Sequence, residues 1–308
     1  MRSRPSGSAR AGLIQIALAG VLWGTGGLAV QVVRDVVEMS TLVISAWRMV
    51  IAAAVLALVL LVSRQGAGVV ALLRARPGHA VLVGTATAAY QALYFGSVVT
   101  AGVTVATVVS LGLAPVLLTL GEAVHDRRVP DAGHLLVLVA ALSGLLLVSG
   151  TAHAGAGGTD PGLGVLLAVA SGATYALATA LGRPLAAVAS PLALTTTTTT
   201  VGALALLPLA AGSALAGSPV LTADPVAGGT LLYLGVMTMA LAYGLLYAGL
   251  RTTPGSAAVV ATLLEPVTAA LVAAAFLDER LSGLGVLGTA LILLAVAGLG
   301  RRPSVPPG

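Results

Sequence analysis

The sequence has no cysteine and no lysine, and only 8% of its 308 residues are charged. Without cysteine the chain can form neither disulfides nor thiolate metal sites. Soluble domains carry about 25% charged residues, whereas this chain is 58% hydrophobic with a mean hydropathy of +1.05. We therefore predict an integral membrane protein. We interpret its net charge of +5 as arginines in loops beside the membrane, not as a nucleic-acid-binding surface.

Apolar segments of span length follow one another along the chain, and they predict an all-α integral membrane protein with ten transmembrane helices. Short turn signals such as Val129-Pro130-Asp131 separate them. The first segment has full span length without a clear cleavage site, so we interpret it as an uncleaved helix and not a signal peptide. The predicted helices cover residues 12–32, 40–62, 79–99, 103–123, 133–150, 163–182, 192–212, 229–250, 256–277 and 283–300.

The positions of the arginines predict the orientation of these helices. With the N-terminus in the cytoplasm, twelve of the fifteen arginines fall on the cytoplasmic side, two (Arg34 and Arg280) fall outside, and Arg48 lies within a span. The positive-inside rule then favours ten spans with both termini in the cytoplasm. All the basic Lys or Arg residues are arginine, and Ala, Gly, Val and Leu are abundant, which indicates a GC-rich bacterial genome. We therefore expect a multi-pass protein of the bacterial inner membrane.

The two halves of the chain repeat one pattern. We predict one five-helix repeat at residues 12–150 and a second at 163–300, between cytoplasmic tails at 1–11 and 301–308. Because each unit has an odd number of helices, the two copies are expected to be inverted relative to each other. Such repeats are typical of secondary transporters, whose substrate site lies near the membrane midplane. The matched positions are Tyr90 with Tyr243, Tyr94 with Tyr247, Pro115 with Pro266, and Trp23 with Tyr175.

In this frame the chain resembles the EamA-type transporters of the drug/metabolite transporter superfamily over about residues 12–300. That resemblance implies secondary transport of small metabolites, amino acids or drugs, without naming a substrate. The first copy departs from the pattern, with Ala114 where an acid could stand and His125 to Arg128 where a Glu-Arg pair is usual. The motifs that carry the resemblance are Leu22-Trp23-Gly24-Thr25, Ala46-Trp47-Arg48, Tyr90 to Pro115, Leu264-Glu265-Pro266 and Asp278-Glu279-Arg280-Leu281.

Two charged side chains are predicted to lie deep within spans. Glu265 is about 15 Å along its helix at 1.5 Å per residue, near the bilayer centre, where a charge is costly. Either it couples transport to protons or holds a substrate amine, or it is a structural acid beside Pro266. Arg48 lies about 12 Å along its helix. It either binds a substrate carboxylate, a phosphate or Glu265, or it reaches the interface or helix carbonyls.

Aromatic residues make up only 3% of the chain, so their recurrence at matched positions is informative. Trp23, Tyr90, Tyr175 and Tyr243 are expected to form a partly aromatic cavity wall. The alternative is an interfacial aromatic belt. Pro115 and Pro266 are expected to break or bend their helices and to expose carbonyls to the cavity. Gln91 either adds a polar contact or faces another helix, and Glu122 and Asp126 are expected to be solvated. The threonine hydroxyls at 195–200 are expected to bond carbonyls of their own helix, with the alternative that one face of this run lines the cavity.

We predict a secondary active transporter that moves an amino acid, an amine or a drug-like solute by alternating access, driven by protons or by the substrate gradient. Export is favoured, and uptake is the alternative. A membrane-embedded enzyme such as a lipid transferase and an accessory membrane protein are the other classes. We expect no metal and no cofactor, and no nucleic acid partner. The absence of a Walker motif argues against direct use of ATP. Two fused repeats make a monomer sufficient, and a homodimer is the alternative.

Overall fold

The computed structural model describes residues 6–151, 160–276 and 282–300, and within them every regular element is a helix. The predicted tail at 301–308 and the Asp278 to Leu281 motif lie outside the described residues. The first helix begins at Ser6, inside the stretch predicted as the N-terminal tail.

The first half of the chain contains seven helices. The first predicted span is divided into α1 and α2 on either side of Thr25. A ten-residue helix, α4, occupies the connection after the second span, where only a loop was expected. It was missed because we searched for segments of membrane-spanning length. The helices are α1 (Ser6–Gly24), α2 (Gly26–Val36), α3 (Thr41–Val62), α4 (Gly66–Ala75), α5 (Pro77–Ala101), α6 (Val103–Asp126) and α7 (Ala132–Thr151).

The second half begins with two long helices and continues with segmented ones. The eighth predicted span contains a π-helical stretch, η1, between two α-helical parts, and the ninth is divided at Leu263. The elements are α8 (Pro161–Val188), α9 (Pro191–Leu215), α10 (Pro225–Tyr233), η1 (Leu234–Leu241), α11 (Ala242–Leu250), α12 (Gly255–Thr262), α13 (Leu264–Phe276) and α14 (Gly283–Gly300).

Several helix starts follow directly from the local sequence. In four helices the preceding Ser or Asp accepts a hydrogen bond from a backbone N–H of the first turn. In three of these, proline occupies the first helical position, where its missing N–H leaves no bond unmade. The capping residues are Ser40 for α3, Asp160 for α8, Ser190 for α9 and Asp224 for α10.

The two prolines predicted to break helices behave differently. Helix α6 continues through Pro115, so the expected break is absent at that residue. Before Pro266 the helix is interrupted at Leu263, whose N–H donates to the Val260 carbonyl at 3.1 Å in a tighter turn. Proline has no N–H for the carbonyl four residues earlier, here that of Thr262, and its ring crowds that oxygen. The break therefore lies just before the proline, in the segment that carries Glu265.

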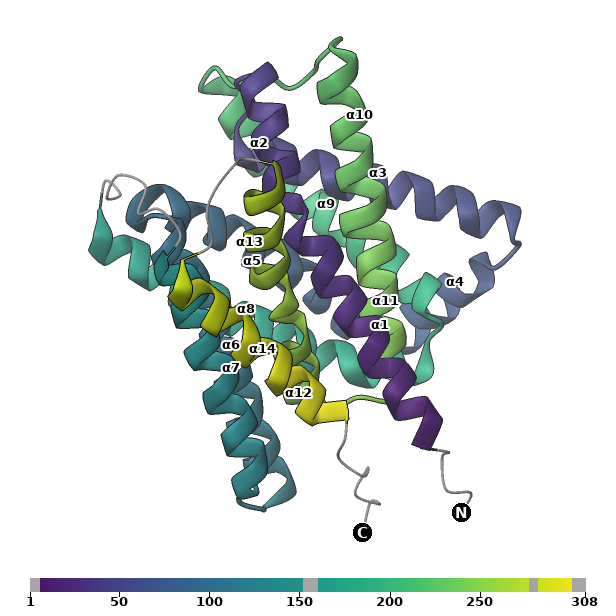
Figure 1. Cartoon of the computed structure of the whole chain (residues 1–308). Coiled ribbons are helices and arrows are strands. Elements are labelled where there is room, and N and C mark those ends of the chain that lie inside the picture. Colours follow the sequence, from purple (N-terminus) through teal and green to yellow (C-terminus); the bar gives the residue numbers. More distant parts are fainter. Residues whose placement is uncertain (1–5, 152–159, 277–281, 301–308) are drawn as a thin grey trace.

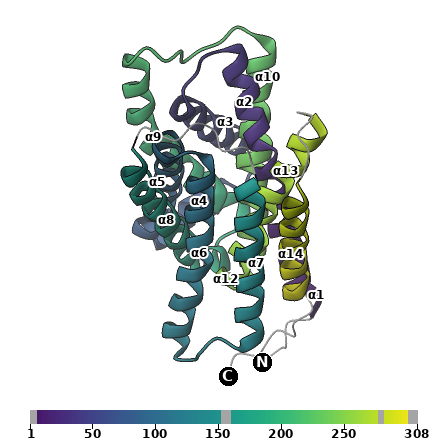
Figure 2. The same cartoon turned by 60° about the vertical axis from the view of Figure 1, so that its left-hand side comes forward.

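The two halves of the chain are intertwined, and neither forms a separate lobe (Figures 1 and 2). Helix α1 packs against α11, α12 and α13 of the second half, and α8 packs in the same way against α5 and α6 of the first. Helix α3 pairs with α9, and α7 pairs with α14. At the α7–α14 crossing the backbones touch, since a Cβ on Gly144 would lie 2.6 Å from the Gly288 carbonyl oxygen. In these pairings the equivalent helices of the two halves contact each other or exchange partners.

Eight helical segments in the described residues are long and apolar enough to cross a membrane, judged by length and composition. The two remaining predicted spans correspond to α5 and to the shorter apolar segment Gly283–Leu299. The total of ten spans therefore stays a prediction. Figures 1 and 2 place the start of α1 and the end of α14 at the same end of the molecule, together with the connection between α6 and α7.

Candidate functional site

Two pairs of aromatic rings join the two halves of the chain. The Trp23 and Tyr243 ring centroids are 5.1 Å apart in an edge arrangement, with 61° between the ring planes. The Tyr90 and Tyr175 centroids are 4.8 Å apart and stacked, with 25° between the planes. Each pair joins the first long helix of one half to a tyrosine on α5 or α11 of the other. The structure thus brings together all four aromatic residues predicted from the repeat.

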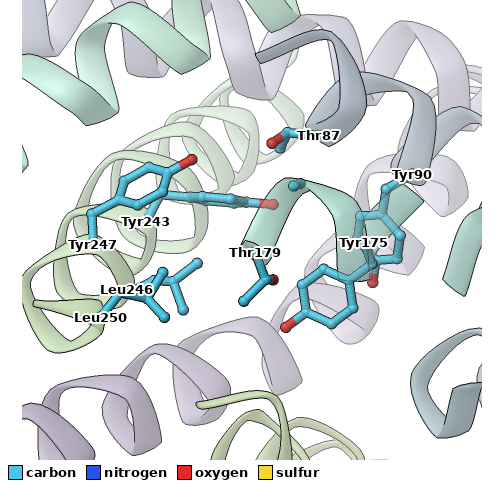
Figure 3. Close-up of a pocket in the computed structure, with 9 residues that line it drawn as sticks. Thr87, Tyr90, Tyr175, Thr179, Tyr243, Leu246, Tyr247 and Leu250 are labelled. Carbon is cyan, nitrogen blue, oxygen red and sulfur yellow. The ribbon is translucent and has the colours of Figure 1, made fainter. Parts of the chain in front are cut away.

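A small pocket lies between α5, α8 and α11, and Figure 3 shows its lining. Tyrosine and threonine hydroxyls share the wall with aliphatic side chains, and the space that they enclose has room for about one water molecule. Of the predicted site residues, Trp23, Arg48, Glu265 and the two prolines, Pro115 and Pro266, lie outside this lining. The residues of the lining are Thr87, Tyr90, Tyr175, Ala178, Thr179, Tyr243, Leu246, Tyr247 and Leu250.

Arg48 on α3 reaches the π-helical element of the second half. Its Nη2 donates to Thr238 Oγ1 at 3.1 Å, and that hydroxyl donates to the Leu234 carbonyl at 2.7 Å. Trp23 Nε1 donates to the Thr238 carbonyl at 2.8 Å. The Arg48 Nε is buried and has no hydrogen-bond partner within the described ranges. Thr238 is therefore a site residue that the sequence reasoning missed, because its only signal was a hydroxyl within an apolar run.

Glu265 is the second residue of α13 and is half-buried. The amide dipoles of a helix start favour negative charge in the first turn. Its carboxyl group lies close enough to Arg48 for the opposite charges of the two side chains to attract each other. Across the described part of the chain, no hydrogen bond or ion pair reaches its carboxyl group. A half-buried acid and an arginine with a spare donor therefore lie near four aromatic rings, and each retains bonding capacity for a third group.

Hydroxyl groups fix several of the aromatic rings. The Tyr175 hydroxyl and Thr262 Oγ1 are 3.0 Å apart, which ties α8 to the end of α12 just before the Leu263 break. The Tyr94 hydroxyl lies 2.9 Å from Thr107 Oγ1. The threonines of α9 behave as expected: the hydroxyls at positions 195–199 donate to backbone carbonyls four residues earlier in the same helix.

Two residues without an assigned role have unusual surroundings. Gln91 is buried, and neither its amide nitrogen nor its amide oxygen has a hydrogen-bond partner in the residues that the structure describes. Glu122 was expected to be solvated, and it is only partly exposed. Its carboxylate accepts hydrogen bonds from the backbone N–H and the hydroxyl of Ser256, which the sequence did not indicate. Asp126, one turn further along α6, is exposed.

Over residues 6–151, 160–276 and 282–300, no three His, Cys, Asp or Glu side chains come together in a way that could hold a metal ion. The site is instead made of aromatic rings, hydroxyls and one separated acid–base pair. Such surfaces bind small molecules by apolar contact and a few directed polar bonds.

The long apolar helices are those of a multi-pass membrane protein. The model of the EamA-like transporter family matches residues 10–150 and 162–301. The chain belongs to this family, which is part of the drug/metabolite transporter superfamily. The family has a two-repeat architecture, in agreement with the two copies expected from the sequence.

The chain is also similar to one curated protein over nearly its full length. It is 31% identical over 293 residues to the uncharacterized transporter YwfM of Bacillus subtilis (strain 168), covering 94% of this chain and 93% of that protein. A crystal structure with 20% sequence identity superposes with a TM-score of 0.76, covering 93% of this chain and 95% of the other. The second likeness concerns the fold alone.

Proposed function

We propose that this protein is a secondary active transporter of ten membrane-spanning helices, arranged as two inverted five-helix repeats in a bacterial inner membrane. In this proposal α5 and α14 complete the ten spans, and both termini face the cytoplasm. The reciprocal packing of α1 and α8 supports the repeat relation, because each contacts the equivalent helices of the other half. Alternating access then follows from rocking of one repeat against the other around a site at their interface.

The observation that carries the proposal is the group of residues at the interface between the halves. Arg48 and Glu265 attract each other without forming an ion pair in the described contacts, so each can turn to a substrate. Trp23, Tyr90, Tyr175 and Tyr243 form the aromatic wall beside them. The pocket between α5, α8 and α11 has room for about one water molecule in this conformation, and rocking of the repeats would widen it to take the apolar part of the solute.

This arrangement fits a small metabolite with one apolar or aromatic portion and at least one charged group. An amino acid, an amine or a drug-like solute meets that description. Arg48 would hold a carboxylate, and Glu265 would hold an amine or a proton that drives the cycle. Pro266 would keep the helix divided at Leu263, so that the Glu265 segment can move relative to α12. We propose export as the direction, with uptake as the alternative.

The first experiment is a thermal-stability screen of the purified protein in detergent. The panel contains amino acids, amines, nucleosides and cationic drugs. A ligand that binds only the folded state raises the apparent melting temperature by mass action. A compound that raises it in the parent protein and not in Arg48→Ala identifies the substrate class. No shift with any class in the panel would count against a binding site of this composition.

The coupling role of Glu265 is tested by transport in proteoliposomes across a pH series. Glu265→Gln keeps the size of the side chain and removes its titration, so proton-dependent transport should lose its pH dependence. Glu38→Gln removes the same charge from an exposed position and should leave the profile unchanged. A Glu265→Gln protein with the pH profile of the parent would exclude the proton-coupling role. Vesicles of opposite orientation, loaded with the identified compound, decide between export and uptake.

A further inference from the structure

Helix α12 is a short segment between two breaks in the chain. It begins at Gly255, after the turn that follows α11, and ends at the Leu263 interruption before α13. The residue before its first turn is Pro254, which makes no side-chain hydrogen bond to the helix. The four helices with a local cap begin after Ser or Asp. Among the described residues, no side chain next to α12 therefore accepts a hydrogen bond from the backbone N–H groups of its first turn, and such an acceptor must come from another part of the chain.

That acceptor comes from the other half of the molecule. Glu122, near the end of α6, accepts a hydrogen bond from the Ser256 backbone N–H at 3.2 Å through Oε1, and one from the Ser256 hydroxyl through Oε2. A carboxylate at a helix start also interacts favourably with the helix dipole. Hydrogen bonds to a charged group are roughly twice as strong as those between neutral groups. This contact thus joins α6 of the first repeat to α12 of the second.

The contact lies beside the pocket at the end of the molecule where α1 begins. A Cβ on Gly255 would lie 3.3 Å from Glu122 Oε1 and 3.7 Å from Thr179 Cγ2, and Thr179 is part of the pocket lining. Gly249, in the last turn of α11, lies against Gly12 near the start of α1. Gly255 and Ser256 are buried among these elements. The pair Glu122–Ser256 therefore bridges α6 and α12 at one end of the pocket.

We propose that the Glu122–Ser256 contact is a latch that holds this end of the transport pathway closed. The inference rests on the proposed alternating-access function, in which the repeats must separate at each end in turn. When they separate here, α12 moves away from α6 about the breaks at its two ends, and both Ser256 bonds are lost. Glu122 is then a positioning residue: it holds the segment that leads to Glu265 and need not touch the substrate.

The absence of native cysteine allows a direct test, because a single introduced thiol is the only one in the chain. A Thr179→Cys reporter on the pocket wall is treated with a small water-soluble methanethiosulfonate, first in detergent and then in proteoliposomes. Adding Glu122→Ala should raise the labelling rate by about tenfold, because losing bonds to a charged acceptor shifts a two-state equilibrium by at least that factor. Adding Ser256→Ala should also raise the labelling rate. The double variant should be labelled no faster than either single variant, because both changes remove the same contact.

Matched controls separate the latch from a purely structural cap. Ser190→Ala removes an ordinary cap from α9 and should leave the labelling rate unchanged, although it lowers the melting temperature. Asp126→Ala removes a nearby exposed carboxylate from α6 and should also have no effect on labelling. If Glu122→Ala does not fold, Glu122→Gln takes its place, with an expected increase of roughly threefold, since an amide oxygen is a weaker acceptor.

An unchanged labelling rate in a folded Glu122 variant would overturn the latch, and so would an equal increase in either control. The assay needs no substrate, so its result is independent of the proposed transport activity. A positive labelling result with no transport of any tested solute would leave the latch in place and count against the proposed substrates. Transport that depends on Arg48, together with an unchanged labelling rate, would support the proposed transport function and overturn the latch.

Discussion

Gly24→Ala should misplace Glu265 without changing any charged or aromatic residue. Gly24 is the last residue of α1 and lies directly on α13. An added Cβ would lie 2.5 Å from the Glu265 carbonyl oxygen and 2.5 Å from Thr268 Cβ, whereas ordinary contact begins at 3.4 Å. Helix α13 must therefore move away by roughly 1 Å. Overpacking of this kind costs about 1–3 kcal/mol, and alanine regains at most about 1 kcal/mol through helix propensity.

The expected result is a net loss of roughly 1–2 kcal/mol in stability, read as a lower melting temperature in detergent. A displacement of about 1 Å at a reacting group can reduce its efficiency about a hundredfold, so transport in proteoliposomes should fall by more than the stability loss explains. Gly27→Ala is the matched control, because nothing lies within 4 Å of a Cβ at that position. Equal melting temperatures and transport rates for the two variants would refute the reasoning.

Other changes test single contacts. Trp23→Phe keeps an aromatic ring beside Tyr243 but removes the 2.8 Å bond to the Thr238 carbonyl; we expect a melting temperature lowered by the equivalent of about 1 kcal/mol, and no decrease would show that the indole N–H contributes little. Tyr175→Phe loses the 3.0 Å contact with Thr262 and leaves the stacked ring in place. We expect a similar stability loss of about 1 kcal/mol, and a double-mutant cycle with Thr262→Val should show that the two losses are not additive. Additive losses would exclude the bond.

Much of the fold could be predicted because it depends on local patterns. The scarcity of charge required a membrane protein, and the apolar runs located the helices of span length. Pro266 indicated the interruption near Glu265, since proline cannot donate the helical hydrogen bond. The ten-residue α4 is too short to register as a span. Helix α6 accommodates Pro115 without an interruption, so the effect of a proline depended on its surroundings and not on the residue alone.

The candidate site was predictable only in part. The internal repeat paired Trp23 with Tyr175 and Tyr90 with Tyr243 as equivalent positions, and these four residues meet in the structure. Thr238 gave no comparable signal, because a lone hydroxyl in an apolar run usually bonds its own helix. It does so here, and it also accepts from Arg48. The second bond depends on α3 and η1 lying side by side, which no local pattern specifies.

By itself the sequence determined that this protein lies in a membrane and where its long helices are, because hydropathy is a property of the chain. It also determined that one pattern occurs twice, because repetition can be read along the chain. Tertiary structure alone decided which copy supplies the partner of each residue. Trp23 meets Tyr243 of the other half, and Glu122 meets Ser256. The physical reason is that the two halves are intertwined: a helix in a bilayer gains little from apolar burial, so close packing and hydrogen bonds between helices distant in sequence select its neighbours.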